Sequence, residues 1–377
     1  MPFNFQELKK RPLKAGSIKV YLVWFDSYGA KSSCIFIETP DIRLLVDPGA
    51  SAMQPSYPLS ATEKEKLCQT ALNTIIDFSR HADTIFISHY HYDHHTLPSR
   101  EKTIYRGKNL WIKDPNRWIN RSQWGRARLF LNQLYETYGS TDYTAMYTEP
   151  ENNLKFNDPV EWLPLAMAKD YGDYQNRKNQ LLEKGRAWFN KTASLWHNEN
   201  WISEIKLKDI DVQIADGSSF KKGSTSVKFT WPMFHGIEYD RVGWVVGLSV
   251  EHKGRKVVYT SDLQGPNIED YAQWIIKENP DILVLDGPAT YLFGFIVNRI
   301  NLQRSIDNLC DILKNTKTGL IVYDHHLLRD ARFKERTAQA YLAARVGKKA
   351  GKKTLLTASE WIGYEPLILK ITKDENE

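Results

Sequence analysis

A dense group of possible metal ligands lies in the stretch SHYHYDHH, residues 88–95. Four histidines and one aspartate fall within seven residues: His89, His91, Asp93, His94 and His95. Imidazole nitrogens and carboxylate oxygens suit Zn²⁺ as ligands, and they also suit Fe and Mn. On extended backbone His89 and His91 point the same way, whereas Asp93 and His94 follow a turn. We therefore predict that the first pair helps to hold one ion and the second pair a neighbouring ion.

Four other apolar runs end directly in a histidine or an aspartate. They are IRLLVD at Asp47, VKFTWPMFH at His235, RKVVYTSD at Asp262, and GLIVYDHH at His325 and His326. Open sheets bind ligands beyond the carboxyl ends of their strands, so these endings can converge on one site. A single histidine in such a place is more often a structural group, but the whole set favours a metal centre. It suffices for two ions that share one carboxylate: His89, His91, Asp93, His94, His235, Asp262 and His325.

Strands must position these residues, and two regions of the chain have strand-like patterns. Length, β-branched content and bounding turns predict strands at 17–26, 33–38, 42–47 and 83–89, with a helix over 62–82. A second region, 209–262, includes a hairpin whose turn uses Gly254 for a positive φ. Beyond it we predict strands at 281–288, 319–326 and 353–358, and helices at 301–316 and 336–351.

The stretch between these regions has a different character. It is rich in tryptophan and contains helix-like segments at 122–139 and 176–196. We therefore predict a first framework half at 1–96, a largely helical insertion at 97–203, and a second framework half at 204–377. Basic and aromatic residues in the insertion could pair phosphates and stack bases, although a solvated basic face is an equally good interpretation. They are Lys108, Trp111, Lys113, Arg117, Trp118, Arg121, Trp124, Arg126 and Arg128.

Composition indicates an ordinary soluble protein of 377 residues, with 42% hydrophobic and 25% charged residues. The charged N-terminus does not resemble a signal peptide and no apolar run could span a bilayer, so we expect a cytoplasmic protein without membrane attachment. Three distant cysteines indicate buried thiols rather than disulfides. The net charge of +6 is compatible with acidic substrates, and the basic run 345–354 is typical of a solvated helix end and loop.

The residues above resemble the metallo-β-lactamase superfamily. SHYHYDHH is similar to its H-x-H-x-D-H signature, and Asp47, the cluster, His235, Asp262 and His325 follow the order of its five motifs. IKDPNRWINRSQWGRA, FHGIEYDRVGWVVG and YDHHLLRDARF resemble a branch of predicted hydrolases known mainly from archaea. The resemblance implies an α/β (α+β) fold: a four-layer αββα sandwich over residues 17 to about 363, with the insertion added to it.

The resemblance also implies a role for each site residue. His89, His91 and His235 would bind the first ion, Asp93, His94 and His325 the second, and Asp262 would bridge them. Asp47 would support the ligands by hydrogen bonds. His325 is preferred to His326 as the last ligand because it directly follows the apolar run. Asp324 and Arg329 would buttress the site, bind substrate or simply form a salt bridge.

The expected chemistry is hydrolysis by a hydroxide that two divalent ions activate, with zinc as the first expectation and iron or manganese as alternatives. No serine or cysteine nucleophile is needed, and Asp93, His95 and His326 are the residues assigned to catalysis. His95 and His326 are the candidate proton donors, and a structural role for His95 is equally open. The favoured substrate is a phosphodiester, in nucleic acid or a nucleotide. The alternatives are a small carboxylic ester, lactone or thioester, and a non-catalytic or iron-redox protein.

Overall fold

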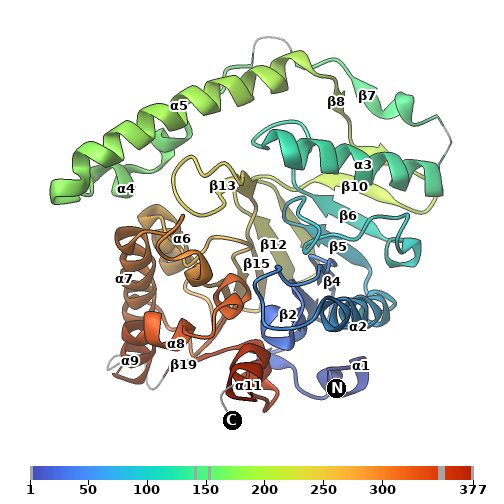
Figure 1. The fold of residues 1–377 in the computed structure, drawn as a ribbon. Helices are drawn as coiled ribbons and strands as arrows, with labels where there is room; N and C mark the ends of the chain where they lie inside the picture. Colours follow the sequence, from blue (N-terminus) through green and yellow to red (C-terminus); the bar gives the residue numbers. More distant parts are fainter. Residues whose placement is uncertain (1–2, 140–141, 152–153, 347–352, 375–377) are drawn as a thin grey trace.

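The strands pair into two mixed sheets that pack face to face (Figure 1). The computed structural model describes residues 3–139, 142–151, 154–346 and 353–374. The eight-stranded sheet has the order β1 (Leu13–Ala15), β2 (Ile18–Phe25), β3 (Ser33–Glu38), β4 (Arg43–Val46), β5 (Thr84–Ile87), β6 (Asn109–Ile112), β10 (Asp211–Ile214) and β9 (Ile205–Lys206). The seven-stranded sheet has the order β11 (Ser219–Lys222), β12 (Thr225–Phe229), β15 (Leu248–His252), β16 (Arg255–Tyr259), β17 (Ile282–Asp286), β18 (Leu320–Asp324) and β19 (Thr354–Leu356).

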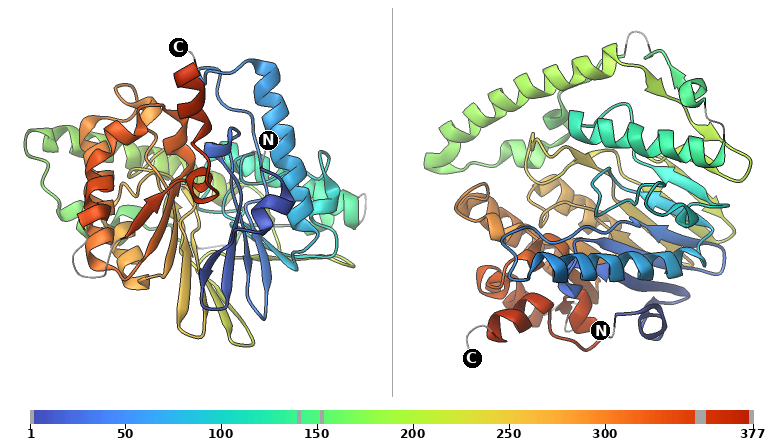
Figure 2. Two further views of the ribbon diagram at one scale, coloured as in Figure 1. Left: turned by 90° about the horizontal axis from the view of Figure 1, so that it is seen from below. Right: turned by 45° about the vertical axis from the view of Figure 1, so that its right-hand side comes forward.

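Helices cover the outer faces of both sheets, which gives the predicted αββα architecture (Figure 2, left). On the side of the first sheet lies α2 (Ala61–Ser79), which begins with a capping box between Ser60 and Glu63. On the side of the second sheet lie α6 (Glu269–Glu278), α7 (Arg299–Asn315) and α9 (Ala338–Val346). Strand β17 is buried along its whole length, as expected for a strand between a facing sheet and a helix layer.

Shorter elements complete the chain. They are α1 (Phe5–Lys9), α4 (Pro164–Ala168), α8 (Phe333–Arg336), α10 (Ala358–Trp361), α11 (Leu367–Asp374), β7 (Tyr147–Thr148), β8 (Trp201–Ile202), β13 (Met233–Phe234) and β14 (Trp244–Val245). The hairpin formed by β15 and β16 turns through Gly254 at φ 75°, as the sequence predicts. No helix within the described ranges combines the length and the apolarity needed to cross a bilayer.

The segment 97–203 contains the two predicted long helices, α3 (Arg121–Tyr138) and α5 (Gln175–Asn198), which lie across the top of the view in Figure 1. It also contains β6, which pairs in parallel with both β5 and β10 inside the eight-stranded sheet. The next strands of the chain, β9 and β10, belong to that same sheet rather than to the second one. The four-residue run of β6 is too short for a periodic pattern, although its Leu110, Trp111 and Ile112 are all buried.

In the basic run 345–354, which we expected to be solvated, Arg345 and Thr354 are exposed. Residues 347–352 lie outside the described residues. At its end, Lys353 is buried and its Nζ donates a 2.5 Å hydrogen bond to the Thr316 carbonyl. This lysine therefore anchors the segment that leads into β19.

Candidate metal centre

The candidate ligands come together where strands end. His89 follows β5, His235 follows β13 and Asp262 follows β16, while His325 begins the 3₁₀ turn η7 (His325–Arg329) after β18. All four side chains are almost completely buried. Because the carboxyl ends of parallel strands meet at one edge, segments more than 230 residues apart in sequence are brought into contact here.

The first ligand group consists of His89, His91, His235 and Asp262, whose donor atoms all lie within 4.8 Å of one another. His89 Nε2 is 2.9 Å from His91 Nδ1 and 3.5 Å from Asp262 Oδ2. His235 Nε2 lies 3.1 Å from the same carboxylate oxygen. Three imidazoles and one carboxylate around a common point could hold one transition-metal ion.

The second group consists of Asp93, His94 and His325, with donor atoms again within 4.8 Å. His94 Nε2 is 3.3 Å from His325 Nε2, which is 3.9 Å from Asp93 Oδ2. Asp262 lies between the groups: its Oδ2 is 3.1 Å from His94 Nε2, and its Oδ1 is 3.4 Å from His325 Nε2. Asp262 also forms a third such group with His325 and His326, so adjacent groups of possible ligands share one carboxylate.

Polar atoms without well-oriented hydrogen bonds indicate which kind of ligand the cluster could bind. Both carboxylate oxygens of Asp262 and Nε2 of His235 are buried, and none has a correctly oriented hydrogen-bond partner among the described residues. A buried polar atom without a well-oriented hydrogen bond is costly, whereas coordination of a cation would satisfy all three atoms. The residues present thus fit a divalent metal ion.

Asp47 orients the second group from behind. Its carboxylate accepts hydrogen bonds from the Ser88 backbone N–H at 2.7 Å and from the Tyr259 hydroxyl at 2.6 Å. It also accepts one from His94 Nδ1 at 2.8 Å, which leaves His94 Nε2 facing Asp262. Burial opposes the charged form of His94, but the carboxylates of Asp262 and Asp47 outweigh it and raise its pKa to about 10.

Close packing around Asp47 depends on Gly49. A Cβ at Gly49 would lie 2.3 Å from the backbone nitrogen of His95. The chain after β4 can therefore approach the ligand loop only because residue 49 has no side chain.

Asp26 is a site residue that our sequence analysis missed. It accepts a 2.7 Å hydrogen bond from His325 Nδ1 through Oδ1 and another 2.7 Å bond from Arg329 Nε through Oδ2. Arg329 also donates to Asp93 at 3.3 Å, so it connects two acidic groups of the site. Burial disfavours the Asp26 carboxylate, but Arg329 and His325 outweigh it and hold its pKa well below the usual range. Asp26 ends the run SIKVYLVWFD, so the rule that identified Asp47 could have found it.

Asp324 contacts backbone rather than Arg329. Its carboxylate accepts from the amides of Ser27, His325 and Ala358 at 3.1, 2.7 and 2.8 Å. Burial raises the pKa of this carboxyl to about 7. Of the roles left open for Asp324, this placement favours a buttress that fixes the start of η7, where His325 has a φ of 64°.

The two candidate proton donors lie in different surroundings. His95 is buried with Nδ1 2.9 Å from the His91 carbonyl and its ring edge-on to Phe130, and burial lowers its pKa to about 4. This placement favours the structural role for His95.

His326 lies beside the cluster, with its ring centroid 5.5 Å from that of His235. Its Nδ1 is 3.0 Å from Asp286, a second strand-end aspartate that our sequence analysis overlooked.

The predicted basic and aromatic stripe is largely engaged within the protein. Lys113 is buried and forms a 2.6 Å ion pair with Asp216. Arg128 is buried, donates to the carbonyls of Pro115 and Asn200, and stacks on Trp124. Arg121 stays exposed, and Arg126 lies over the ring of Tyr92. Neither of the two interpretations left open, a stripe for phosphates and bases or a solvated basic face, describes the whole set, because Lys113 and Arg128 are buried and have partners within the protein.

The four-layer sandwich with its ordered His/Asp cluster defines a protein of the metallo-β-lactamase fold class. No protein-family model matches the chain. The chain belongs to the UPF0282 family: it is 30% identical over 351 residues to a UPF0282 protein of Korarchaeum cryptofilum, covering 93% of this chain and 91% of that relative. A UPF0282 protein of Methanopyrus kandleri is 29% identical over 369 residues, covering 95% of this chain and 98% of the relative.

Among solved structures, the metallo-β-lactamase fold protein YhfI from Bacillus subtilis is similar to this chain. The likeness covers 90% of this chain and 95% of that one, with 11% identity and a TM-score of 0.42.

Proposed function

We propose that this protein is a metal-dependent hydrolase that uses two divalent ions, with zinc as the first expectation and iron or manganese as alternatives. The observation that carries the proposal is the position of Asp262, buried between ligand groups whose histidine nitrogens surround it, with no well-oriented hydrogen bond to either oxygen among the described residues. His89, His91 and His235 would hold one ion, Asp93, His94 and His325 the other, and Asp262 both. When bound, such ions lower the pKa of a shared water and stabilise the oxygens of the attacked group.

The protein itself would contribute orientation and proton handling. Asp47 and Asp26 hold the Nδ1 atoms of His94 and His325, so that the Nε2 atoms face the site. Arg329 fixes the Asp93 carboxylate. Asp286 holds Nδ1 of His326, which leaves His326 Nε2 as the atom that we assign to proton transfer with the leaving group.

A phosphodiester, in nucleic acid or a nucleotide, remains the favoured substrate. Two basic side chains, Arg329 and Lys31, lie beside the second ligand group and support an anionic substrate. Arg329 is already paired with Asp26 and Asp93, whereas Lys31 lies near the Arg329 guanidinium, which together with burial lowers the pKa of Lys31. A phosphate at this end of the site would favour the charged form of Lys31.

Turnover of matched substrates tests this proposal. Zinc-loaded protein is expected to cleave bis-p-nitrophenyl phosphate and to stop when a chelator is added. The same preparation is assayed with p-nitrophenyl butyrate and with a lactone. Turnover of the carboxylic esters alone would overturn the phosphodiester assignment, and full activity of Asp262→Ala would overturn the site.

A further inference from the structure

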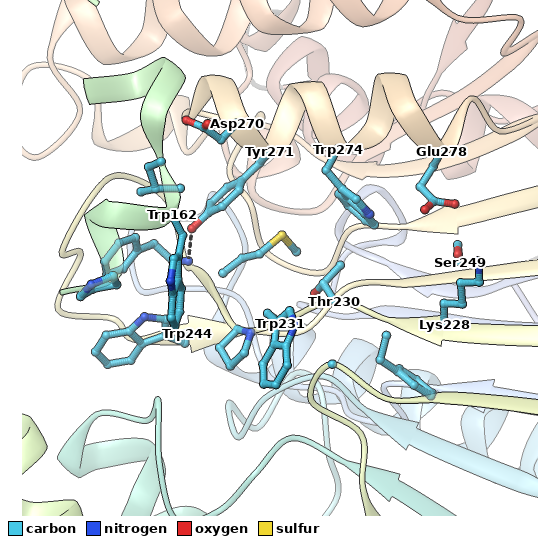
Figure 3. Close-up of a pocket in the computed structure, with 17 residues that line it drawn as sticks. Trp162, Lys228, Thr230, Trp231, Trp244, Ser249, Asp270, Tyr271, Trp274 and Glu278 are labelled. Carbon is cyan, nitrogen blue, oxygen red and sulfur yellow. Dashed lines mark hydrogen bonds between the residues drawn. The ribbon is translucent and has the colours of Figure 1, made fainter. Parts of the chain in front are cut away.

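A second cavity lies apart from the metal centre, between the insertion and the outer face of the second sheet (Figure 3). Its volume is about 710 Å³, within the range of small-molecule sites. None of the candidate metal ligands lines it. Aromatic side chains dominate its walls: Trp162, Trp231, Trp244, Tyr271 and Trp274.

The aromatic walls are fixed in place. The Tyr271 hydroxyl accepts a 2.7 Å hydrogen bond from the backbone N–H of Phe234, as the dashed line in Figure 3 marks. The Trp231 ring covers Gly217, where a Cβ would come within 2.7 Å of it, although 66% of Trp231 is exposed. Trp162, which belongs to the insertion and lines the cavity, is 46% exposed. Aromatic faces that remain open to solvent are suited to an apolar ligand.

The charged groups of the lining decide which kind of ligand fits. Asp270 accepts hydrogen bonds from the amides of Leu165 and Ala166, and Glu278 pairs with Lys256 at 2.8 Å. Lys228 has no ion-pair partner in the described part of the chain. Both carboxylates are thus occupied, and the ammonium of Lys228 is the charge available to a ligand.

We propose that this aromatic cavity binds a small amphipathic anion, with its apolar body between the tryptophans and its anionic group at Lys228. The site does not depend on the proposed hydrolase activity. Met233 and Phe234 of β13 line the cavity and directly precede His235, so a bound ligand would contact the strand that positions a candidate metal ligand.

Titration calorimetry with 1-decanesulfonate and 1-decanol tests the proposal, because the two probes share an apolar chain and differ in charge. We expect one sulfonate per chain, with Kd raised about fivefold in Lys228→Gln, the loss expected for one ion pair. Decanol binding should be unchanged in that variant. Lys277→Gln removes an exposed lysine of α6 outside the cavity and serves as the control.

Ser249→Phe should fill the cavity and abolish binding of both probes, and Trp274→Ala should weaken both if Ser249→Phe does not fold. Equal sulfonate affinity in Lys228→Gln and Lys277→Gln would overturn the assignment of the anionic group. Undiminished binding of both probes in the cavity variants, or no binding to the wild type, would overturn the site.

Discussion

At the scale of single residues, Asp26 is a buried carboxylate whose charged form is stabilised by its neighbours. It lies fully buried between His325 and Arg329, two groups that would otherwise lack a counter-charge on that side. Supporting groups of this kind commonly change metal affinity by about 10- to 100-fold when removed.

Asp26→Asn should therefore weaken retention of the second ion while leaving the first group intact. We expect metal content to fall towards one ion per chain on dialysis against a weak chelator. The matched control is Asp77→Asn, which removes a partly exposed carboxylate on α2 that pairs with Arg80. Equal metal retention in both variants would contradict the role of Asp26.

The neighbouring histidines His325 and His326 give a second prediction. His325 Nε2 lies among Asp93, His94 and Asp262, whereas His326 Nδ1 is held by Asp286. His325→Gln should lose an ion, and His326→Gln should keep both ions but turn over substrate more slowly, by about 10²- to 10⁴-fold for a lost proton donor. Loss of an ion from His326→Gln alone would reverse the assignment.

At the scale of elements, strand ends were the predictable part of the site. Asp47, His89, His235, Asp262 and His325 all follow apolar runs, and the structure brings them together. The same rule applied to two more runs would have found Asp26 and Asp286. Gln123 of α3, whose Nε2 lies 3.5 Å from His91 Nε2, could not be predicted. It accepts from the Tyr90 N–H and donates to the Val242 carbonyl, contacts that depend on how the insertion packs.

The insertion is joined to the sandwich by buried ion pairs around Glu238. This carboxylate pairs with Lys178 of α5 at 2.5 Å and with Arg304 of α7 at 2.6 Å. Burial alone would raise the pKa of Glu238, but Arg304 and Lys178 outweigh it and lower the pKa to about 2. A lowered folded-state pKa contributes stability above the unfolded pKa, and that stability disappears as pH falls towards about 2.

Acid should therefore lower the unfolding free energy of the wild type more than that of a variant that cannot ionise at position 238. From the shift between 4.5 and about 2, we expect roughly 3 kcal/mol of unfolding free energy to depend on Glu238. Urea unfolding at pH 5 and pH 3 covers most of this transition, so the wild type should lose about 2 kcal/mol more unfolding free energy between the two values than Glu238→Gln. Parallel pH profiles for the two proteins would contradict this account.

At the scale of the whole molecule, the αββα framework was predictable because most of its strands lie in apolar runs bounded by turns. The assignment of strands to sheets was not, because the pairing of β6, β9 and β10 is decided by contacts across the sheet. The site draws on both sheets, so its occupancy should influence the stability of the whole sandwich.

Metal removal should accordingly lower the melting temperature. An ion that binds only the folded chain stabilises it by about 4 kcal/mol at a thousandfold excess over Kd. Calorimetry before and after chelation should show a drop in melting temperature that added Zn²⁺ reverses. The melting temperature of Asp262→Asn should change little on chelation. An unchanged melting temperature after chelation would mean that the cluster holds no structurally coupled ion.

Elemental analysis of protein purified with added metal tests whether two ions share Asp262. We expect close to two divalent ions per chain in the wild type and a clear loss in Asp262→Asn. A value near zero in the wild type, or two ions retained in Asp262→Asn, would contradict it.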